Sequence, residues 1–200
     1  MNSEHLNKKR GFAVSSRVSI CLGIFLMALS SAWAGRAYSA ADDPQVVKDF
    51  EARVSSYLDL SKKQSPAPKP TDSPSKLAET HDQIAEKMRA ARPDAKQGDI
   101  FTPKIAAYFR HQIAATLAGH DGRKVRASLR HAEPVQNVPL QVNARYPQKL
   151  PLQSTPPTLL LNLPHLPREL QYRIVGRALL LYDAQADLIV DFVPEAVLSN

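Results

Sequence analysis

The sequence predicts an α+β fold, in which three to four N-terminal amphipathic helices pack on a small C-terminal antiparallel β-hairpin or sheet. Three observations support this class. Apolar residues recur every three or four positions between residues 44 and 118. Ser73-Pro74 and Thr102-Pro103 are typical helix starts. Two runs rich in β-branched residues follow near the C-terminus, which indicates strands.

The first predicted helix covers residues 44–63. Its apolar side chains share one face, and they are Val47, Phe50, Val54, Tyr57 and Leu58. The prolines between residues 64 and 75 prevent helix or sheet pairing, because proline lacks a backbone donor, so we expect a stiff connector there. The opposite face of the helix is charged, which indicates a surface helix packed on a core.

Three further helices complete the predicted N-terminal part. The second starts at Pro74, runs to about Lys96 with a bend at Pro93, and stops at Gly98. The third starts after Thr102 and breaks at the Gly119–Gly122 loop. Asp121 then caps a short fourth helix that carries Val125 and Leu129.

The strands are predicted after a proline-rich stretch that begins at Glu133. Alternation over Val138–Val142 suggests one short edge strand, and Thr158–Leu163 suggests a helical turn. The runs Arg173–Tyr182 and Leu188–Val193 are then expected to form a hairpin whose turn is Asp183–Asp187.

The N-terminal residues have the pattern of a signal peptide. Four basic residues within Met1–Arg17 precede the uncharged apolar run Val18–Ala32, which is too short to span a bilayer comfortably. Ala32-Trp33-Ala34 supplies small residues for cleavage between Ala34 and Gly35, and cleavage after Ala41 is the alternative. The predicted organisation is a signal peptide at 1–34, an amphipathic helix with a proline-rich connector at 35–75, and a single α+β domain at 76–200.

Two variants of export are less well supported by the same residues. Lys9 stands where a twin-arginine signal has its first arginine, and Cys21 lies near the start of the apolar run, whereas a lipobox cysteine closes it. A Sec-type signal and a periplasmic or secreted protein are therefore expected, with no membrane span after cleavage.

Cleavage changes the composition of the chain. It removes four of the 26 basic and one of the 19 acidic residues, so the net charge falls from +7 to +4 over 166 residues. This charge is ordinary for a domain of that size and does not indicate nucleic-acid binding. The sole cysteine, Cys21, and the sole tryptophan, Trp33, are also lost, which excludes thiol catalysis and a disulfide framework.

The candidate binding site is a pair of arginines on the predicted hairpin. Arg173 and Arg177 would share one strand face that is incompletely covered, and guanidinium groups bind carboxylates and phosphates well. Asp191 on the neighbouring strand would either neutralise one of them or complete the site. The expected partner is an envelope protein or an anionic envelope ligand, and no cofactor is expected.

Two further groups of polar residues resemble a metal site and a catalytic site, but the sequence explains both by structural roles. Asp183, Asp187 and Asp191 recur at intervals of four, yet in strands and turns such aspartates usually bind their own backbone, so no metal site is expected. His120-Asp121 lies in a glycine-flanked loop, where a histidine beside a carboxylate can act as a base. No serine nucleophile accompanies it, and no catalytic residue is assigned.

Three segments carry a resemblance to known proteins. Gln97–Pro103, Tyr172–Arg177 and Leu188–Phe192 resemble a group of bacterial exported or secreted proteins of unknown function. The resemblance implies an envelope setting and no activity. The preferred hypothesis is therefore a small periplasmic binding or interaction protein that uses a sheet face or edge. The alternative is an envelope hydrolase with a site near His120 and Asp121.

Overall fold

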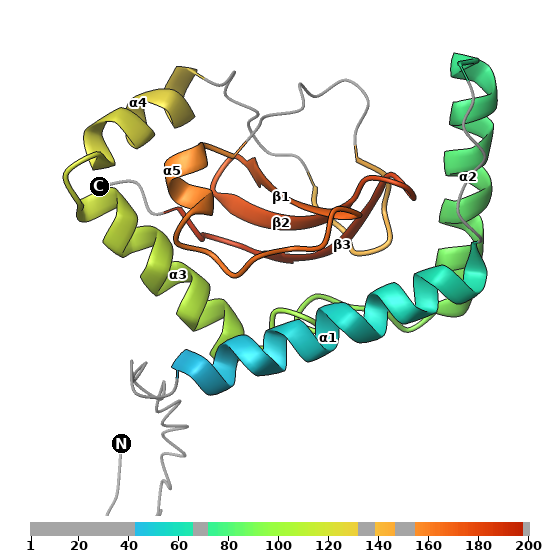
Figure 1. The fold of residues 1–200 in the computed structure, drawn as a ribbon, viewed down its shortest axis with the longest axis horizontal. Coiled ribbons are helices and arrows are strands. Elements are labelled where there is room, and N and C mark those ends of the chain that lie inside the picture. The colour runs from blue at the N-terminus through green and yellow to red at the C-terminus, as the bar shows by residue number, and fades with distance from the viewer. Residues whose placement is uncertain (1–42, 66–71, 132–138, 147–154, 198–200) are drawn as a thin grey trace, which may run out of the picture. The chain divides into compact units, whose positions relative to one another are not determined.

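The computed structural model describes residues 43–65, 72–131, 139–146 and 155–197. All of them belong to one compact unit that begins at Ala37. Helices come first and a three-stranded antiparallel sheet comes last, which confirms the predicted α+β class (Figure 1). The predictions for residues 1–34 and for residues 66–71 of the connector lie outside the described residues.

Helices α1 (Asp43–Gln64) and α2 (Pro74–Ala91) begin where the sequence indicates. The end of α2 was predicted wrongly, because the helix stops at Ala91 and does not continue to Lys96. Arg92 leaves the helix with φ −133° and ψ 55°. The ring of the following Pro93 disfavours helical geometry for the residue before it, which explains the early end.

Helix α3 (Pro103–Ala118) has the predicted cap, since the Thr102 side chain accepts a hydrogen bond from Ile105 N. Helix α4 (Gly122–His131) then folds back on the end of α3. A Cβ atom at Gly122 would lie 1.8 Å from the Leu117 carbonyl oxygen, so only glycine permits this close approach. Arg126 donates a hydrogen bond of 2.6 Å to the same carbonyl, which fixes the start of α4 beside the end of α3.

The sheet has three strands, whereas the sequence predicted a two-stranded hairpin. The run Arg173–Tyr182 is divided into β1 (Leu170–Val175) and β2 (Ala178–Asp183) by a turn at Gly176 and Arg177. Gly176 adopts φ 57°, the positive φ that a two-residue hairpin turn requires at its first position. Strand β3 (Leu188–Val193) pairs with β2 as expected, so the order is β1-β2-β3.

The segment before the sheet also differs from its prediction. The described part of Val138–Val142 contains no strand, and pairing with the sheet occurs later, as a single bridge between Arg145 and Leu188. Helix α5 (Pro157–Leu160) is the helical turn expected before Pro164.

The helices cover one face of the sheet. Leu179, Leu181 and Val190 of the sheet share a buried core with α1, α2 and α3. Within it the rings of Phe50, Phe101 and Phe109 contact one another, with centroid distances of 5.0–5.7 Å. A smaller apolar cluster on the opposite face includes Tyr146, Leu180 and Tyr182. No helix in the described ranges is both long enough and apolar enough to cross a membrane.

Candidate functional site

The edge of the sheet at β3 is covered by residues from three other parts of the chain. Asn143 N donates to Ile189 O, and Ile189 N donates to Ala144 O, each at 2.9 Å. The guanidinium of Arg92 lies within 3.2 Å of Asn143 Oδ1 and 3.5 Å of Val190 O. The outward backbone groups of β3 are therefore used in packing, and this edge offers little to a partner.

Asp191 anchors a loop to the β3 edge. Its carboxylate is fully buried and accepts hydrogen bonds from the backbone N–H groups of Gly98 (3.0 Å), Ile100 (2.8 Å) and Phe101 (2.7 Å). It also accepts one from Phe192 N at 2.8 Å. Four donors satisfy the carboxylate, so its role is to position the loop that starts α3.

The opposite edge of the sheet, at β1, borders a pocket of about 620 Å³. The pocket lies between β1 and the chain from Thr155 to Leu166, which includes α5. Thr155 Oγ1 donates to Tyr172 O (2.8 Å), and Tyr172 Oη donates to Pro164 O (2.9 Å), so the two walls are fixed relative to each other. The apolar lining consists of Leu160, Leu161, Leu163, Pro164, Leu166, Leu170 and Tyr172, and the polar lining of Thr155, His165, Gln171 and Arg173.

Arg173 brings a positive charge to this largely apolar pocket. One of its Nη atoms donates to the side chain of Gln171, and its guanidinium lies 5.6 Å from the centre of the Tyr182 ring. Its Nε is buried and has no hydrogen-bond partner among the described residues. Among the described residues, no carboxylate forms an ion pair with Arg173.

The structure does not bring the three predicted binding residues together. Arg177 lies in the turn after β1, where it forms an ion pair with Glu195 and donates to Val197 O at 3.4 Å. The prediction that Arg173 and Arg177 share a strand face was wrong, because the turn at Gly176 separates them. Asp191 pairs with neither arginine, since backbone amides occupy its carboxylate.

The other two aspartates of the predicted series serve the β2–β3 turn. Asp183 Oδ1 accepts from Gln185 N (2.8 Å) and Ala186 N (2.9 Å), the backbone capping expected of a turn aspartate. Asp187 Oδ1 accepts from Tyr182 Oη at 2.8 Å. Within the described ranges, no group of three or more histidine, cysteine or acidic side chains is arranged to hold a metal ion.

Two buried tyrosines have strongly perturbed hydroxyl groups. Burial raises the pKa of Tyr57 far above its usual value, and the neighbouring Asp183, which accepts a hydrogen bond of 2.7 Å from the Tyr57 hydroxyl, raises this pKa further. Burial likewise raises the pKa of Tyr172 at the pocket. Both side chains are protonated structural donors at neutral pH, and neither is poised to act as a base.

The His120-Asp121 pair lies in the loop between α3 and α4. Its His120 Nδ1 and Asp121 Oδ1 atoms are 3.5 Å apart, and 96% of the His120 side chain is exposed. A hollow of about 320 Å³ beside it is also lined by Thr116 and Thr158. Thr116 Oγ1 donates to Gln112 O and accepts from Asn162 Nδ2, so its hydroxyl hydrogen points away from any base.

Leu160, at the end of α5, and Leu161, directly after it, are the site residues that sequence reasoning missed. Leu161 is 84% exposed and Leu160 is 40% exposed, while Leu159 is fully buried. One signal was present in the sequence: three consecutive leucines on a single turn point in different directions, so at least one must leave the core. The pocket itself could not be predicted, because it joins this turn to β1 only in the folded chain.

The fold and the site define an α+β domain with an apolar, arginine-bearing pocket at an open sheet edge. No protein-family model, curated protein or solved structure matches the chain.

Proposed function

We propose that this chain is an exported cell-envelope protein that binds an anionic amphiphile, a molecule with an apolar tail and a carboxylate or phosphate head. The tail occupies the leucine-lined pocket at the β1 edge, and the head pairs with Arg173. The observation that carries the proposal is a guanidinium without an acidic partner among the described residues, at the wall of a mostly apolar pocket.

The pocket has the size and the lining of a small-molecule site. Its volume of about 620 Å³ is within the roughly 300–1,000 Å³ of known ligand pockets, which combine apolar walls with a few polar groups. A charge-assisted hydrogen bond from an arginine contributes about 1.5–3 kcal/mol, whereas the apolar wall binds any tail of suitable length. The arginine therefore favours anionic over neutral ligands.

The experiment is calorimetric titration of the mature chain with dodecanoate and with the uncharged dodecyl maltoside. Arg173→Gln is expected to weaken dodecanoate binding about 10- to 100-fold and to leave the neutral compound unaffected. Arg177→Gln is the matched control, because it removes the same charge from the turn beyond the pocket. Leu160→Glu places a carboxylate in the wall and is expected to repel dodecanoate.

Two results would contradict the pocket assignment. One is that wild-type protein binds neither compound, and the other is that Arg173→Gln and Arg177→Gln weaken dodecanoate equally. Circular dichroism of each variant shows whether it is folded. Since Leu160 is 40% exposed, Leu160→Glu remains an informative variant if Arg173→Gln fails to fold.

The export part of the proposal rests on the basic and apolar segments of residues 1–34. It is tested by the mass of the mature protein recovered from the periplasmic fraction, which should begin at Gly35, or at Asp42 for the alternative cleavage. Mature protein should also lack tryptophan fluorescence, because Trp33 is the only tryptophan. Recovery of the chain with Met1 retained would contradict cleavage.

The alternative function, an envelope hydrolase at His120 and Asp121, has less support from the geometry. The imidazole is almost fully exposed, and the neighbouring Thr116 hydroxyl is not directed at it. Loss of a hydrolytic activity in the double variant His120→Ala/Asp121→Ala, with unchanged thermal stability, would favour this alternative.

A further inference from the structure

Helix α4 carries an unusual concentration of positive charge. Its ten residues include four lysines or arginines and no acidic residue. Asp121 just before the helix pairs with Lys124 at 3.3 Å, so it offsets only one of these charges.

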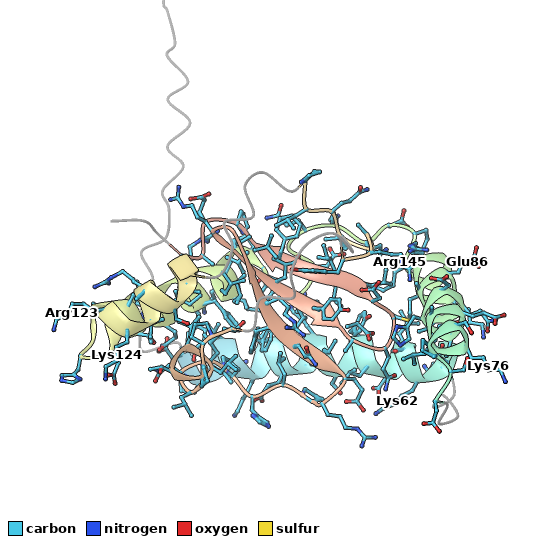
Figure 2. The ribbon with its side chains drawn as sticks, turned by 90° about the horizontal axis from the view of Figure 1, so that it is seen from above. Lys62, Lys76, Glu86, Arg123, Lys124 and Arg145 are labelled. Atoms are coloured by element: carbon cyan, nitrogen blue, oxygen red, sulfur yellow. The ribbon has the colours of Figure 1, made fainter. Side chains whose placement is uncertain are left out.

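The packing of α4 directs part of this charge outward. Val125 is buried and Leu129 packs against the core, which fixes the inner side of the helix. Arg126 is held by the Leu117 carbonyl. Arg123 and Lys124 remain exposed, and Figure 2 shows them at one end of the view while Lys62 and Lys76 lie at the other.

Exposed leucines lie on the neighbouring helix. Helices α4 and α5 both contact α3, and Asn162 Nδ2, just after α5, donates to Thr116 Oγ1 of α3 at 3.1 Å. The loop that starts α4 and the residues of α5 line one hollow of about 320 Å³. Leu161, with 84% of its surface exposed, follows the last residue of α5.

We propose that Arg123, Lys124 and Leu161, together named the α4–α5 surface, dock the protein on an anionic lipid bilayer. Basic side chains attract anionic headgroups, and an exposed leucine gains free energy by entering the acyl boundary. A nucleic acid fits less well, because α4 and α5 contain no phenylalanine, tyrosine or tryptophan for base stacking and water would still surround the leucine. Arg123 and Lys124 do not line the pocket, so their part in docking does not depend on ligand binding there.

The surface also adjoins the pocket, because Leu161 lines it. A protein docked in this way would hold the pocket mouth next to the bilayer, where anionic amphiphiles are concentrated. Docking and ligand capture would then act in sequence.

The test is sedimentation of the mature chain with vesicles. Half of the lipid is phosphatidylglycerol and half is phosphatidylcholine, and vesicles of phosphatidylcholine alone serve as the neutral comparison. Each basic residue near such a surface strengthens partitioning about fivefold, so Arg123→Gln/Lys124→Gln should weaken it roughly 25-fold. The control variant Lys62→Gln/Lys76→Gln removes the same amount of charge from the opposite end of the molecule in Figure 2, so it should have little effect on vesicle binding.

The variant Leu161→Ser measures how much the leucine contributes to vesicle binding, apart from the basic side chains. It should reduce binding to the vesicles several-fold at an ionic strength high enough to screen Arg123 and Lys124. The exposure of Arg123, Lys124 and Leu161 makes misfolding of these variants unexpected.

Several outcomes would overturn the proposal. They are equal binding to charged and neutral vesicles, equal loss in the two double variants, and binding to duplex DNA without binding to vesicles. Dodecanoate titration of Arg123→Gln/Lys124→Gln distinguishes the two proposals, since pocket binding should be unchanged when docking is lost.

Discussion

The two edges of the sheet differ in how their polar groups are used. At β3, backbone and side-chain groups from residues 92, 98–101 and 143–146 meet the strand, and the buried Asp191 has four donors. At β1, the chain from Thr155 to Leu166 contacts the strand through two side-chain hydrogen bonds and leaves a pocket between them. Arg173 is one of the residues that line this pocket, and its buried Nε has no hydrogen-bond partner among the described residues.

This difference separates structural charges from charges available to a ligand. A buried charge with all its partners supplied by the chain stabilises one conformation and has no capacity left for another molecule. A partly buried charge without an acidic partner beside an apolar pocket keeps that capacity. The contrast therefore assigns Asp191 to folding and supports the proposal that Arg173 binds a ligand, although the sequence suggested that the two residues act together.

The largest expected effect is at the β3 edge. Asp191→Ala leaves the buried N–H groups of Ile100 and Phe101 without an acceptor, so we expect the free energy of unfolding to fall by about 3–5 kcal/mol. Urea denaturation followed by circular dichroism measures this loss. Asp191→Asn retains one oxygen acceptor and should cost less. A loss below about 1 kcal/mol in the alanine variant would contradict the view that the charge at the β3 edge is structural, in contrast to the charge at the β1 edge.

Alkaline pH should lower the free energy of unfolding of the domain through two buried tyrosines, Tyr57 and Tyr172. The pKa of each hydroxyl is raised in the folded chain, whereas in the unfolded chain it is about 10. Above about pH 10 the unfolded state releases protons that the folded state retains, so each tyrosine lowers the free energy of unfolding by about 1.4 kcal/mol per pH unit.

This pH dependence is measured by urea denaturation at several values around pH 10, with tyrosinate absorbance as a second signal. Stability contributed by these tyrosines is fully present below pH 10. Because burial also raises the pKa of Tyr182, Tyr57→Phe should remove about a third or less of the slope above it. A tyrosinate signal from all tyrosines in a chain that is still folded would contradict the assignment.

An intermediate effect is expected at Asn143, which holds residues 143–146 on the β3 edge. Its side chain donates to Arg92 O (2.8 Å) and accepts from Arg92 Nη1 (3.2 Å), and its φ is 64°. Asn143→Ala should cost about 2 kcal/mol, from two hydrogen bonds and a strained backbone. Asn143→Gly relieves the strain and should cost about 1 kcal/mol less, so equal thermal melting of the two variants would contradict this account.

The smallest stability effect is expected at the β1 edge. Arg173→Gln removes a hydrogen bond to Gln171 and a contact with the Tyr182 ring but no ion pair among the described residues, so the free energy of unfolding should change by no more than about 1 kcal/mol. Its effect should instead appear in dodecanoate affinity. A destabilisation as large as that of Asp191→Ala would place Arg173 among the structural charges and remove the basis of the binding site.

The sequence by itself determined the helices, because local signals specify them. Apolar spacing places α1, and the cap-then-proline pairs place the starts of α2 and α3. The glycine break places α4. The runs near the C-terminus also indicate strands, although the first run is divided by a turn at Gly176. A run of ten residues is long for a strand, and a glycine inside it indicates a turn.

Only the tertiary structure decided which charges share a site. The turn at Gly176 reverses the chain, so Arg177 lies away from Arg173, and strand pairing places Asp191 beside a loop that is 90 or more residues earlier. Likewise, Leu161 and Arg173 line one pocket because α5 folds back along β1. Periodicity along a chain specifies which way each side chain points within its own element, whereas contacts between elements depend on turns and on packing of the whole core.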